Sequence, residues 1–268
     1  MIAAPATSSS TPSPVATPRA ASCAAQTRTA PAAPALIELA GVEGAAHGSG
    51  AALHGIDLRV EQNEFIAITG AAHAGKSALL NLLAGLEAPG AGSYSFRGVR
   101  VDTLSHTNLS LLRRFFIGHV PPGFHPRQAR TVQDYVEAPY AAYAASGDSA
   151  LTRRITAEAA LESAGLPGWG GARLTGLTRA QLRRAAIARA LVTRPALLLV
   201  DEDGADEARA LTRSSDEIME LLGELHRDGE LTVIAVSADA RAAQGARRVL
   251  HMQDGRIARE TRDYTLRA

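Results

Sequence analysis

A glycine-bounded loop at residues 70–77 has the residue types and spacing best suited to chemistry. Its sequence, Gly70-Ala-Ala-His-Ala-Gly75-Lys76-Ser77, fits the phosphate-binding pattern G-x-x-x-x-G-K-[ST], the P-loop or Walker A motif. Glycines let successive N–H groups turn toward phosphate oxygens, and a helix that opens at the loop adds its positive end. The expected nucleotide-binding residues are Gly70, Ala71, Ala72, His73, Ala74, Gly75, Lys76, Ser77 and Ala78.

Within this loop, Lys76 is expected to reach the outer phosphates, and the Ser77 hydroxyl is expected to bind Mg²⁺. Lys76 is the only lysine in the chain, and every other permanently charged cation is arginine. A compact ammonium on a flexible stem suits a reaching contact, whereas a guanidinium is a planar fork. A chance match in a glycine-rich turn is disfavoured because an apolar strand precedes the loop and an apolar helix follows it.

A second group of candidate residues follows a short apolar run far downstream. Residues 196–200 read Ala-Leu-Leu-Leu-Val, as expected of a strand buried on both faces, and Asp201-Glu202 follow. This is the Walker B pattern, in which the first carboxylate organises Mg²⁺ and the second polarises an attacking water. Alone, the pair would read as a solvated strand end. Parallel strands end at one edge of a sheet, so Asp201 and Glu202 are expected near Lys76.

The elements around these residues predict an α/β fold of P-loop NTPase type. We expect a mostly parallel core, an antiparallel β flank and a helical subdomain at about 125–192. The expected strands and hairpins are 36–39, 56–60, 65–69, 94–101, 117–120, 196–200, 231–236 and 249–258, with a turn at 43–50. The expected helices begin at Lys76 and span 103–115, 132–143, 150–164, 179–191 and 212–227.

Composition limits the alternatives. The 268 residues carry a net charge of +1, so a nucleic-acid partner is not indicated. The single cysteine, Cys23, excludes an internal disulfide and fits a reducing compartment, and no apolar run approaches the roughly 20 residues of a membrane span. Residues 1–35 are expected to be a disordered tail, with an organelle transit peptide as the alternative. Residues 36–262 are the expected domain.

From residue 36 to about residue 260, the chain resembles the ATP-binding subunit of ABC transporters. The type is that of lipoprotein-release and macrolide-export permeases. Residues 184–200 are very similar to the segment that joins the signature helix of that family to Walker B, and residues 250–257 resemble its closing hairpin. The resemblance implies ATP and Mg²⁺ as ligands, and a second ABC ATP-binding domain in a homo- or heterodimer. It also implies a transmembrane permease subunit and a cytoplasmic location, peripheral at the inner face of the cell membrane.

The chain departs from the family pattern where the γ-phosphate would be sensed. The signature L-S-G-G-Q corresponds to residues 177–181, Leu-Thr-Arg-Ala-Gln, which lack both glycines. The usual glutamine falls on Pro122, and Gln128 and Gln133 lie too far along the chain to replace it. The other departures are Ala238 for the switch histidine, Asp203 for the proline after Glu202, Ala208 for a loop aspartate, although Asp206 is close to that position, and His47 as the nearest candidate for the adenine-stacking aromatic.

Three hypotheses follow. The first is an ABC transporter subunit that binds Mg-ATP and hydrolyses it, with Glu202 as general base, to drive a permease. The second is a slow or non-hydrolysing ABC-type nucleotide-binding module, regulatory or one half of a heterodimer. The third is an unrelated P-loop enzyme such as a small-molecule kinase. Arg183 and Arg184 are expected on a solvated helix face, and Trp169 is expected to be a packing plug. The transported substrate and its direction are not written in this sequence.

Overall fold

The computed structural model describes residues 35–44, 52–122, 129–141, 149–202, 212–229, 231–237 and 245–262. The predicted tail lies outside the described residues, apart from Ala35. The elements in chain order are β1 (Ile37–Gly44), β2 (Leu53–Val60), β3 (Phe65–Gly70), α1 (Lys76–Leu83), β4 (Ala91–Phe96), β5 (Val99–Arg100), η1 (Val101–Thr103), α2 (His106–Phe115), β6 (Ile117–Val120), α3 (Val132–Ala141), α4 (Ala150–Ser163), η3 (Leu174–Gly176), α5 (Arg179–Leu191), β7 (Leu197–Asp201), α6 (Thr212–Asp228), β8 (Thr232–Val236), β9 (Arg248–Gln253) and β10 (Arg256–Arg262).

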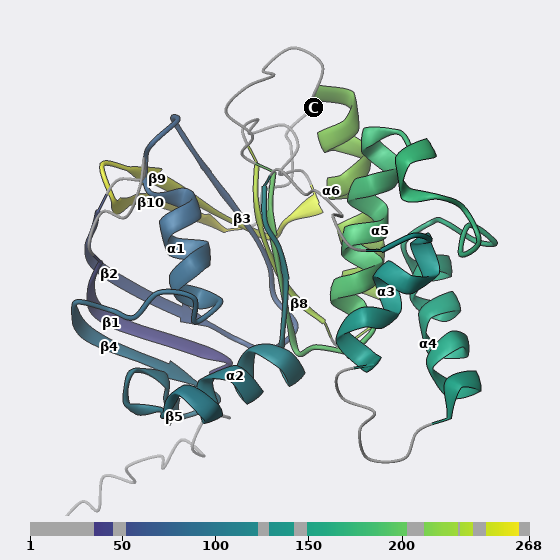
Figure 1. Cartoon of the computed structure of the whole chain (residues 1–268). Helices are drawn as coiled ribbons and strands as arrows, with labels where there is room; N and C mark the ends of the chain where they lie inside the picture. The colour runs from purple at the N-terminus through teal and green to yellow at the C-terminus, as the bar shows by residue number, and fades with distance from the viewer. Residues whose placement is uncertain are drawn as a thin grey trace, which may run out of the picture. The chain divides into compact units, whose positions relative to one another are not determined.

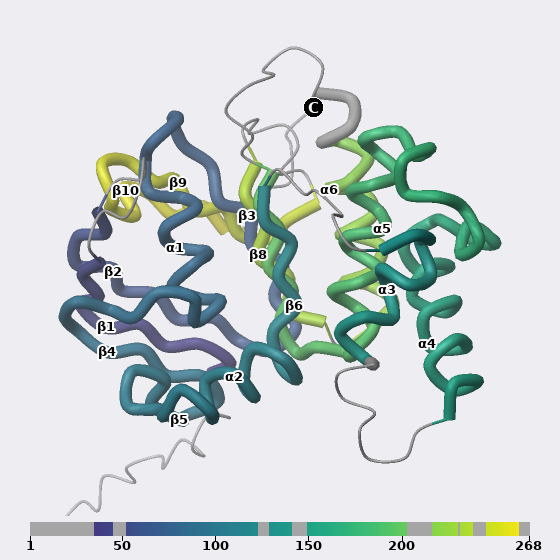
Figure 2. Tube along the Cα trace, viewed as in Figure 1, coloured from purple at the N-terminus to yellow at the C-terminus, as the bar shows by residue number. Residues whose placement is uncertain are grey.

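Two sheets organise the described part of the chain (Figure 1). The central sheet has the order β10-β9-β3-β8-β7-β6, with parallel pairs from β9 to β6 and the antiparallel β10 at one edge. The second sheet, β2-β1-β4-β5, is antiparallel throughout. The predicted parallel core and antiparallel flank are therefore confirmed, and the Asp254-Gly255 hairpin is the edge of the central sheet (Figure 2).

The central strands alternate between two apolar cores because successive side chains of a strand point to opposite faces. On β3, Phe65 and Ala67 pack in the core formed with α3–α6. Ile66 and Ile68 instead pack in the core shared with α1 and the antiparallel sheet. In Figure 1, α1 lies between the two sheets, and the helical part lies beyond the other face of the central sheet. The same alternation on β7 decides where Asp201 and Glu202 point.

The first two strands are longer than the sequence predicted. A turn was expected at 43–50, but β1 continues through Gly44, and β2 already begins at Leu53. The register of β1 against β2 shifts between Leu39 and Val42, at Gly41. A bulge there absorbs an extra residue and lets the strand continue where glycine alone suggests a turn. The remainder of the expected turn, residues 45–50, lies outside the described residues.

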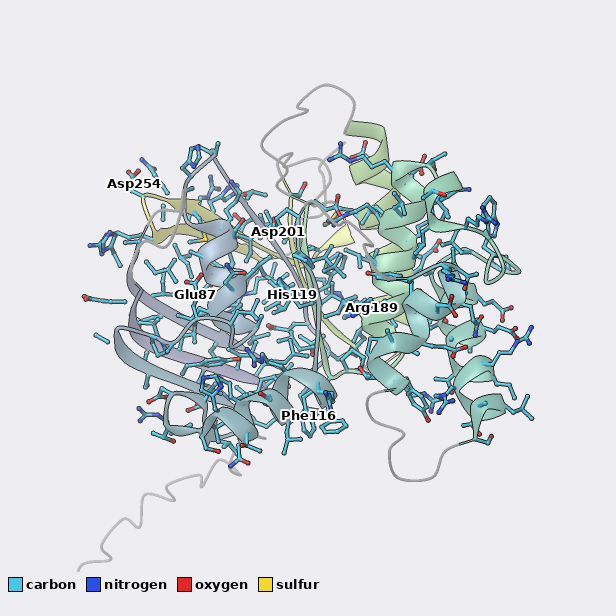
Figure 3. All side chains as sticks on the ribbon, in the orientation of Figure 1. Glu87, Phe116, His119, Arg189, Asp201 and Asp254 are labelled. Atoms are coloured by element: carbon cyan, nitrogen blue, oxygen red, sulfur yellow. The ribbon has the colours of Figure 1, made fainter. Side chains whose placement is uncertain are left out.

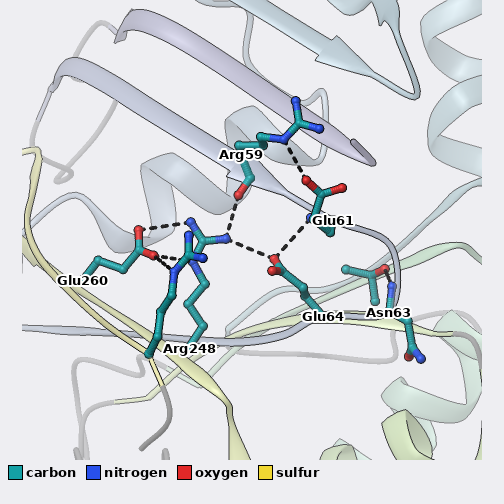
Figure 4. A network of polar contacts seen from close by, with 8 residues as sticks. Arg59, Glu61, Asn63, Glu64, Arg248 and Glu260 are labelled. Carbon is teal, nitrogen blue, oxygen red and sulfur yellow. Dashed lines mark hydrogen bonds and ion pairs between the residues drawn. The ribbon is translucent and has the colours of Figure 1, made fainter. Parts of the chain in front are cut away.

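Arg248 ties the edge of the central sheet together (Figure 4). It is 6% exposed. Its guanidinium donates to both carboxylate oxygens of Glu260, at 2.9 and 3.1 Å, to Glu64 Oε2 at 3.0 Å, and to the carbonyl oxygen of Arg59 at 2.6 Å. The hydrogen bonds from Arg248 hold the pKa of Glu260 below its ordinary value. The network joins β9 to β10, to the end of β2 and to the residue before β3.

Arg248→Met is expected to lower the free energy of unfolding by about 2 kcal/mol near pH 7, because two carboxylates lose a charged donor. A carboxylate with a lowered folded-state pKa stabilises the fold above its unfolded pKa, about 4.3, and loses that contribution as the pH falls through the folded value. Urea unfolding at pH 7 and pH 4 should therefore show a smaller difference between variant and wild type at pH 4. An equal difference at both pH values contradicts the role given to Glu260.

Candidate functional site

The loop between β3 and α1 has the geometry of a phosphate cradle. β3 ends at Gly70, one residue later than predicted, and α1 begins at Lys76, as the sequence predicted. The backbone takes positive φ values at His73 (63°) and Gly75 (95°). At these residues the chain curves around the N-terminal end of α1. A Cβ on Gly70 would overlap the carbonyl oxygen of Met252, so β9 approaches the loop closely. These conformations let backbone N–H groups converge on an anion.

Lys76 and the start of α1 fit a bound phosphate. Lys76 is 2% exposed, and its Nζ donates to the carbonyl oxygens of Gly70, at 2.9 Å, and Ala71. The ammonium is thus folded over the loop. No side chain caps α1 at Gly75, whereas hydroxyls of Ser105, Ser149 and Thr178 cap α2, α4 and α5. The first N–H groups of α1 therefore lack the side-chain oxygen that usually accepts from them, as an anion-binding helix end requires.

Asp201 lies at the same edge of the central sheet as the loop. Ile68 of β3 and Asp201 of β7 both pair with Val236 of β8, so the two residues are at one level, about two strand spacings or 10 Å apart. Asp201 is 2% exposed. Figure 3 labels it near the end of the central strands. This register places Asp201 and the loop at the same sheet edge, and the closeness of Asp201 to Lys76 stays a prediction.

The two carboxylates after β7 point to different faces. Along β7, Leu197 and Leu199 pack on the α1 side and Leu198 and Val200 on the α5 side. By the same alternation, Asp201 is directed toward the side of α1 and Glu202 toward α5. The backbone N–H of Glu202 bonds to the carbonyl of Val236 at 3.3 Å, which continues the ladder to this residue.

Arg183 of α5 occupies the position next to Glu202, and the prediction that it lies on a solvated face is wrong. Arg183 Nε lies 2.8 Å from Glu202 Oε1, and Nη2 also contacts that oxygen. The two side chains are only 10% and 7% exposed. Burial raises the pKa of Glu202, and the charge of Arg183 opposes that rise. Arg183 has helical spacing to the buried Ala186, Ile187 and Ala190, but this signal alone does not distinguish it from Arg184, which has the same spacing to Ile187 and Ala188.

Arg184 is also less solvated than expected. Its Nη1 donates to the carbonyl oxygen of Ala164 at 3.4 Å, and its Nη2 lies 3.9 Å from Glu217. The side chain of Arg184 is 24% exposed. Trp169 is 39% exposed, so it is not the packing plug that the sequence suggested.

The segment at the signature position forms an ordinary helix start. Thr178 caps α5 by accepting from the backbone N–H of Gln181 at 3.3 Å, and the Gln181 side chain accepts from the N–H of Thr178 at 2.9 Å. This reciprocal capping box satisfies the helix end within the chain. The Gln133 side chain donates to Glu137 and to the carbonyl of Arg154, within the helical part. Ala238, His47, Asp203, Asp206, Ala208 and Gln128 lie outside the described residues.

The hairpin between β9 and β10 supports the loop, a contact that sequence reasoning missed. The N–H of Gly255 donates to the carbonyl of Ala74 at 3.0 Å, and the carbonyl of Gly255 accepts from the N–H of His54 at 2.9 Å. Asp254 and Gly255 both have positive φ, 47° and 72°, as a tight two-residue hairpin turn requires.

Gly255→Ala is expected to destabilise the fold by about 3 kcal/mol and to weaken nucleotide binding. A Cβ at this position would overlap the carbonyl oxygen of Ala52, so the backbone beneath Ala74 must shift. Gly98→Ala is the matched control, because Gly98 follows Arg97 in a similar turn with φ 78°, yet nothing lies near its Cβ position. Its expected cost is about 1 kcal/mol. Thermal unfolding of both variants tests this, and equal losses would contradict the proposed overlap.

A buried strand, a phosphate cradle and an acidic strand end at one edge of a parallel sheet define a P-loop nucleotide-binding domain. Residues 53–204, more than half of the chain, match the family model described as ABC transporter. The chain belongs to the ABC transporter family, as the resemblance at the start indicated. This membership excludes the third hypothesis, an unrelated P-loop kinase.

The named relatives of the chain are export ATP-binding/permease proteins. It is 40% identical over 226 residues to the macrolide export ATP-binding/permease protein MacB of Wolinella succinogenes, covering 83% of this chain and 34% of that protein. It is 39% identical over 210 residues to the pyoverdine export ATP-binding/permease protein PvdT of Pseudomonas fluorescens, covering 78% and 31%. The chain thus spans about a third of the length of these relatives.

Solved structures agree with this assignment. The dimeric, post-hydrolysis ATP-binding cassette MJ0796, bound to ADP and Pi, aligns with a TM-score of 0.74 at 28% identity. The alignment covers 84% of this chain and 98% of that one. Among the described residues, no helix has the length and apolar character needed to cross a bilayer.

Proposed function

We propose that this chain binds Mg-ATP in the loop at residues 70–78 and hydrolyses it to drive a separate transmembrane permease. The observation that carries the proposal is the position of Lys76. Its buried ammonium lies over the phosphate cradle, at the sheet edge that also bears Asp201. A buried cation whose bonds to loop carbonyls can be exchanged for phosphate oxygens is suited to binding a triphosphate.

Each candidate residue is given a role that fits its chemistry. Lys76 and the N–H groups of residues 70–78 bind the phosphates, and Ser77 and Asp201 supply the oxygens that hold Mg²⁺. When bound, Mg²⁺ supplies positive charge that neutralises the phosphate oxygens. Glu202 accepts a proton from the attacking water. Positioning and charge placement, rather than covalent chemistry by the protein, account for the rate of such a reaction.

The proposed partners are a permease and a second ATP-binding domain. The named relatives carry ATP-binding and permease parts under one name, and this chain matches only about a third of each. The MJ0796 cassette is described as a dimer with ADP and Pi. We therefore propose a homo- or heterodimer of this domain, held by a separate permease at the inner face of the cell membrane.

The second hypothesis, a slow or non-hydrolysing module, differs from the first only in the rate of ATP hydrolysis. Two observations bear on it, the capped helix start at Thr178 and the ion pair of Glu202 with Arg183. The deciding experiment titrates Mg-ATP and measures phosphate release in parallel, with and without a co-purified permease. Binding with release supports the first hypothesis, binding without release supports the second, and an absence of binding overturns both.

A further inference from the structure

The guanidinium of Arg183 contacts three residues in two segments, the end of β6 and the end of β7. Nη1 donates to the carbonyl of Pro121, after β6, at 2.8 Å, and Nη2 donates to the carbonyl of Asp201, at the end of β7. Nε and Nη2 both contact Glu202 Oε1. All three guanidinium nitrogens are thus engaged by the chain itself, and Arg183 is fixed in place.

This ion pair directs Glu202 toward α5 instead of toward the cradle. α5 packs on the face of the central sheet opposite to α1, and the alternation along β7 directs Glu202 to the α5 side. Oε1 accepts from two guanidinium nitrogens, so this oxygen is engaged by a permanent cation. A general base must instead lie within hydrogen-bond reach of the attacking water.

We propose that Arg183 is a positioning residue that restrains Glu202 in a resting arrangement, and that Glu202 must leave this ion pair to act on water. The inference rests on the proposed function, because it concerns the same hydrolytic site. Separating a buried ion pair is costly, since neither charge regains a partner in the low-dielectric interior. The restraint therefore slows turnover and leaves nucleotide binding at Lys76 unaffected.

The restraint also connects Glu202 to the start of α5. Arg183 lies one helical turn after Arg179, the first residue of α5 and part of the segment at the signature position. The charge of Arg179 also acts on Glu202. A movement of α5 relative to β7 would change the distance between Arg183 and Glu202. Contact between a partner and the start of α5 could thus release the base.

Arg183→Gln tests the restraint through steady-state hydrolysis. The amide can still donate hydrogen bonds but carries no charge, so kcat is expected to rise about fivefold or more, with KM for Mg-ATP unchanged. Arg184→Gln is the matched control, because it removes the same charge from the next residue, whose side chain contacts the carbonyl of Ala164 and the carboxylate of Glu217. The control should keep the wild-type kcat. The double variant Arg183→Gln/Glu202→Gln should be no faster than Glu202→Gln.

A second measurement tests the ion pair without reference to activity. Urea unfolding of the wild type, Arg183→Gln, Glu202→Gln and the double variant forms a double-mutant cycle. If the pair exists in solution, the double variant loses less stability than the sum of the single losses. Additive losses overturn the inference, and so does a folded Arg183→Gln protein whose kcat is unchanged or lower. Failure of the wild type to bind a fluorescent ATP analogue instead overturns the proposed function, while a non-additive cycle would still support the pair.

Discussion

Lys76→Ala is expected to raise the Kd for Mg-ATP by about 100-fold or more. The Nζ of Lys76 makes at least two charge-assisted contacts in the loop, and phosphate oxygens would take the place of the carbonyls of Gly70 and Ala71. Each hydrogen bond to a charged group is worth about 1.5–3 kcal/mol, so two of them correspond to about 3 kcal/mol at least. A loss of that size lowers affinity by roughly two orders of magnitude.

The measurement is a titration with a fluorescent ATP analogue, supported by circular dichroism to establish that the variant folds. Arg154→Ala is a suitable control, because it removes one positive charge from a side chain that is 69% exposed and remote in sequence from the loop. The control should bind as the wild type does. Lys76→Arg should also bind poorly, since a planar fork does not fit where an ammonium is enclosed. A Kd for Lys76→Ala within threefold of wild type contradicts the assigned site.

Local patterns predicted those parts of the fold that local chemistry determines. The sequence placed the start of β3, the start of α1 and the bounds of α5 correctly, because apolar period and glycine position act within a few residues. The Asp254-Gly255 turn followed from its own dipeptide. The length of β1 did not, because the bulge at Gly41 is set by its pairing with β2.

The candidate site likewise has one part that the sequence predicts and one part that only the tertiary structure determines. The meeting of Asp201 and the loop at one edge could be predicted, since every parallel strand of a sheet ends on the same side. The partner of Glu202 could not be read from the motif, because Arg183 lies 19 residues earlier on another element. Only the rotation of α5 about its axis decides which arginine faces the sheet. Both arginines have buried residues at helical spacing, Ala186 and Ile187 for Arg183 and Ile187 and Ala188 for Arg184, so the packing of α5 on the sheet, and not the sequence, selects Arg183.

Glu202→Gln is expected to lower phosphate release by about 10²- to 10⁴-fold while the Kd for Mg-ATP stays within a few-fold of wild type. The amide cannot accept a proton from water, yet it has the shape of the carboxyl and an oxygen that can still accept from Arg183 Nε. Arg183 also keeps its bonds to the carbonyls of Pro121 and Asp201, so the variant should fold. Phosphate release and nucleotide binding are measured on the same preparation, so that a loss of turnover is distinguished from a loss of affinity for Mg-ATP.

Glu158→Gln serves as the control, because it neutralises a carboxylate that is 57% exposed on α4 and should leave turnover unchanged. Asp201→Asn should instead weaken Mg-ATP binding, since it alters the proposed oxygen ligand of the metal and leaves the proposed base unchanged. The pair of variants thus distinguishes loss of the base from loss of the metal site. If wild-type turnover does not exceed that of Glu202→Gln, with and without a permease, Glu202 is not acting as a base. The chain is then a nucleotide-binding module in which Glu202 stays permanently in its ion pair with Arg183.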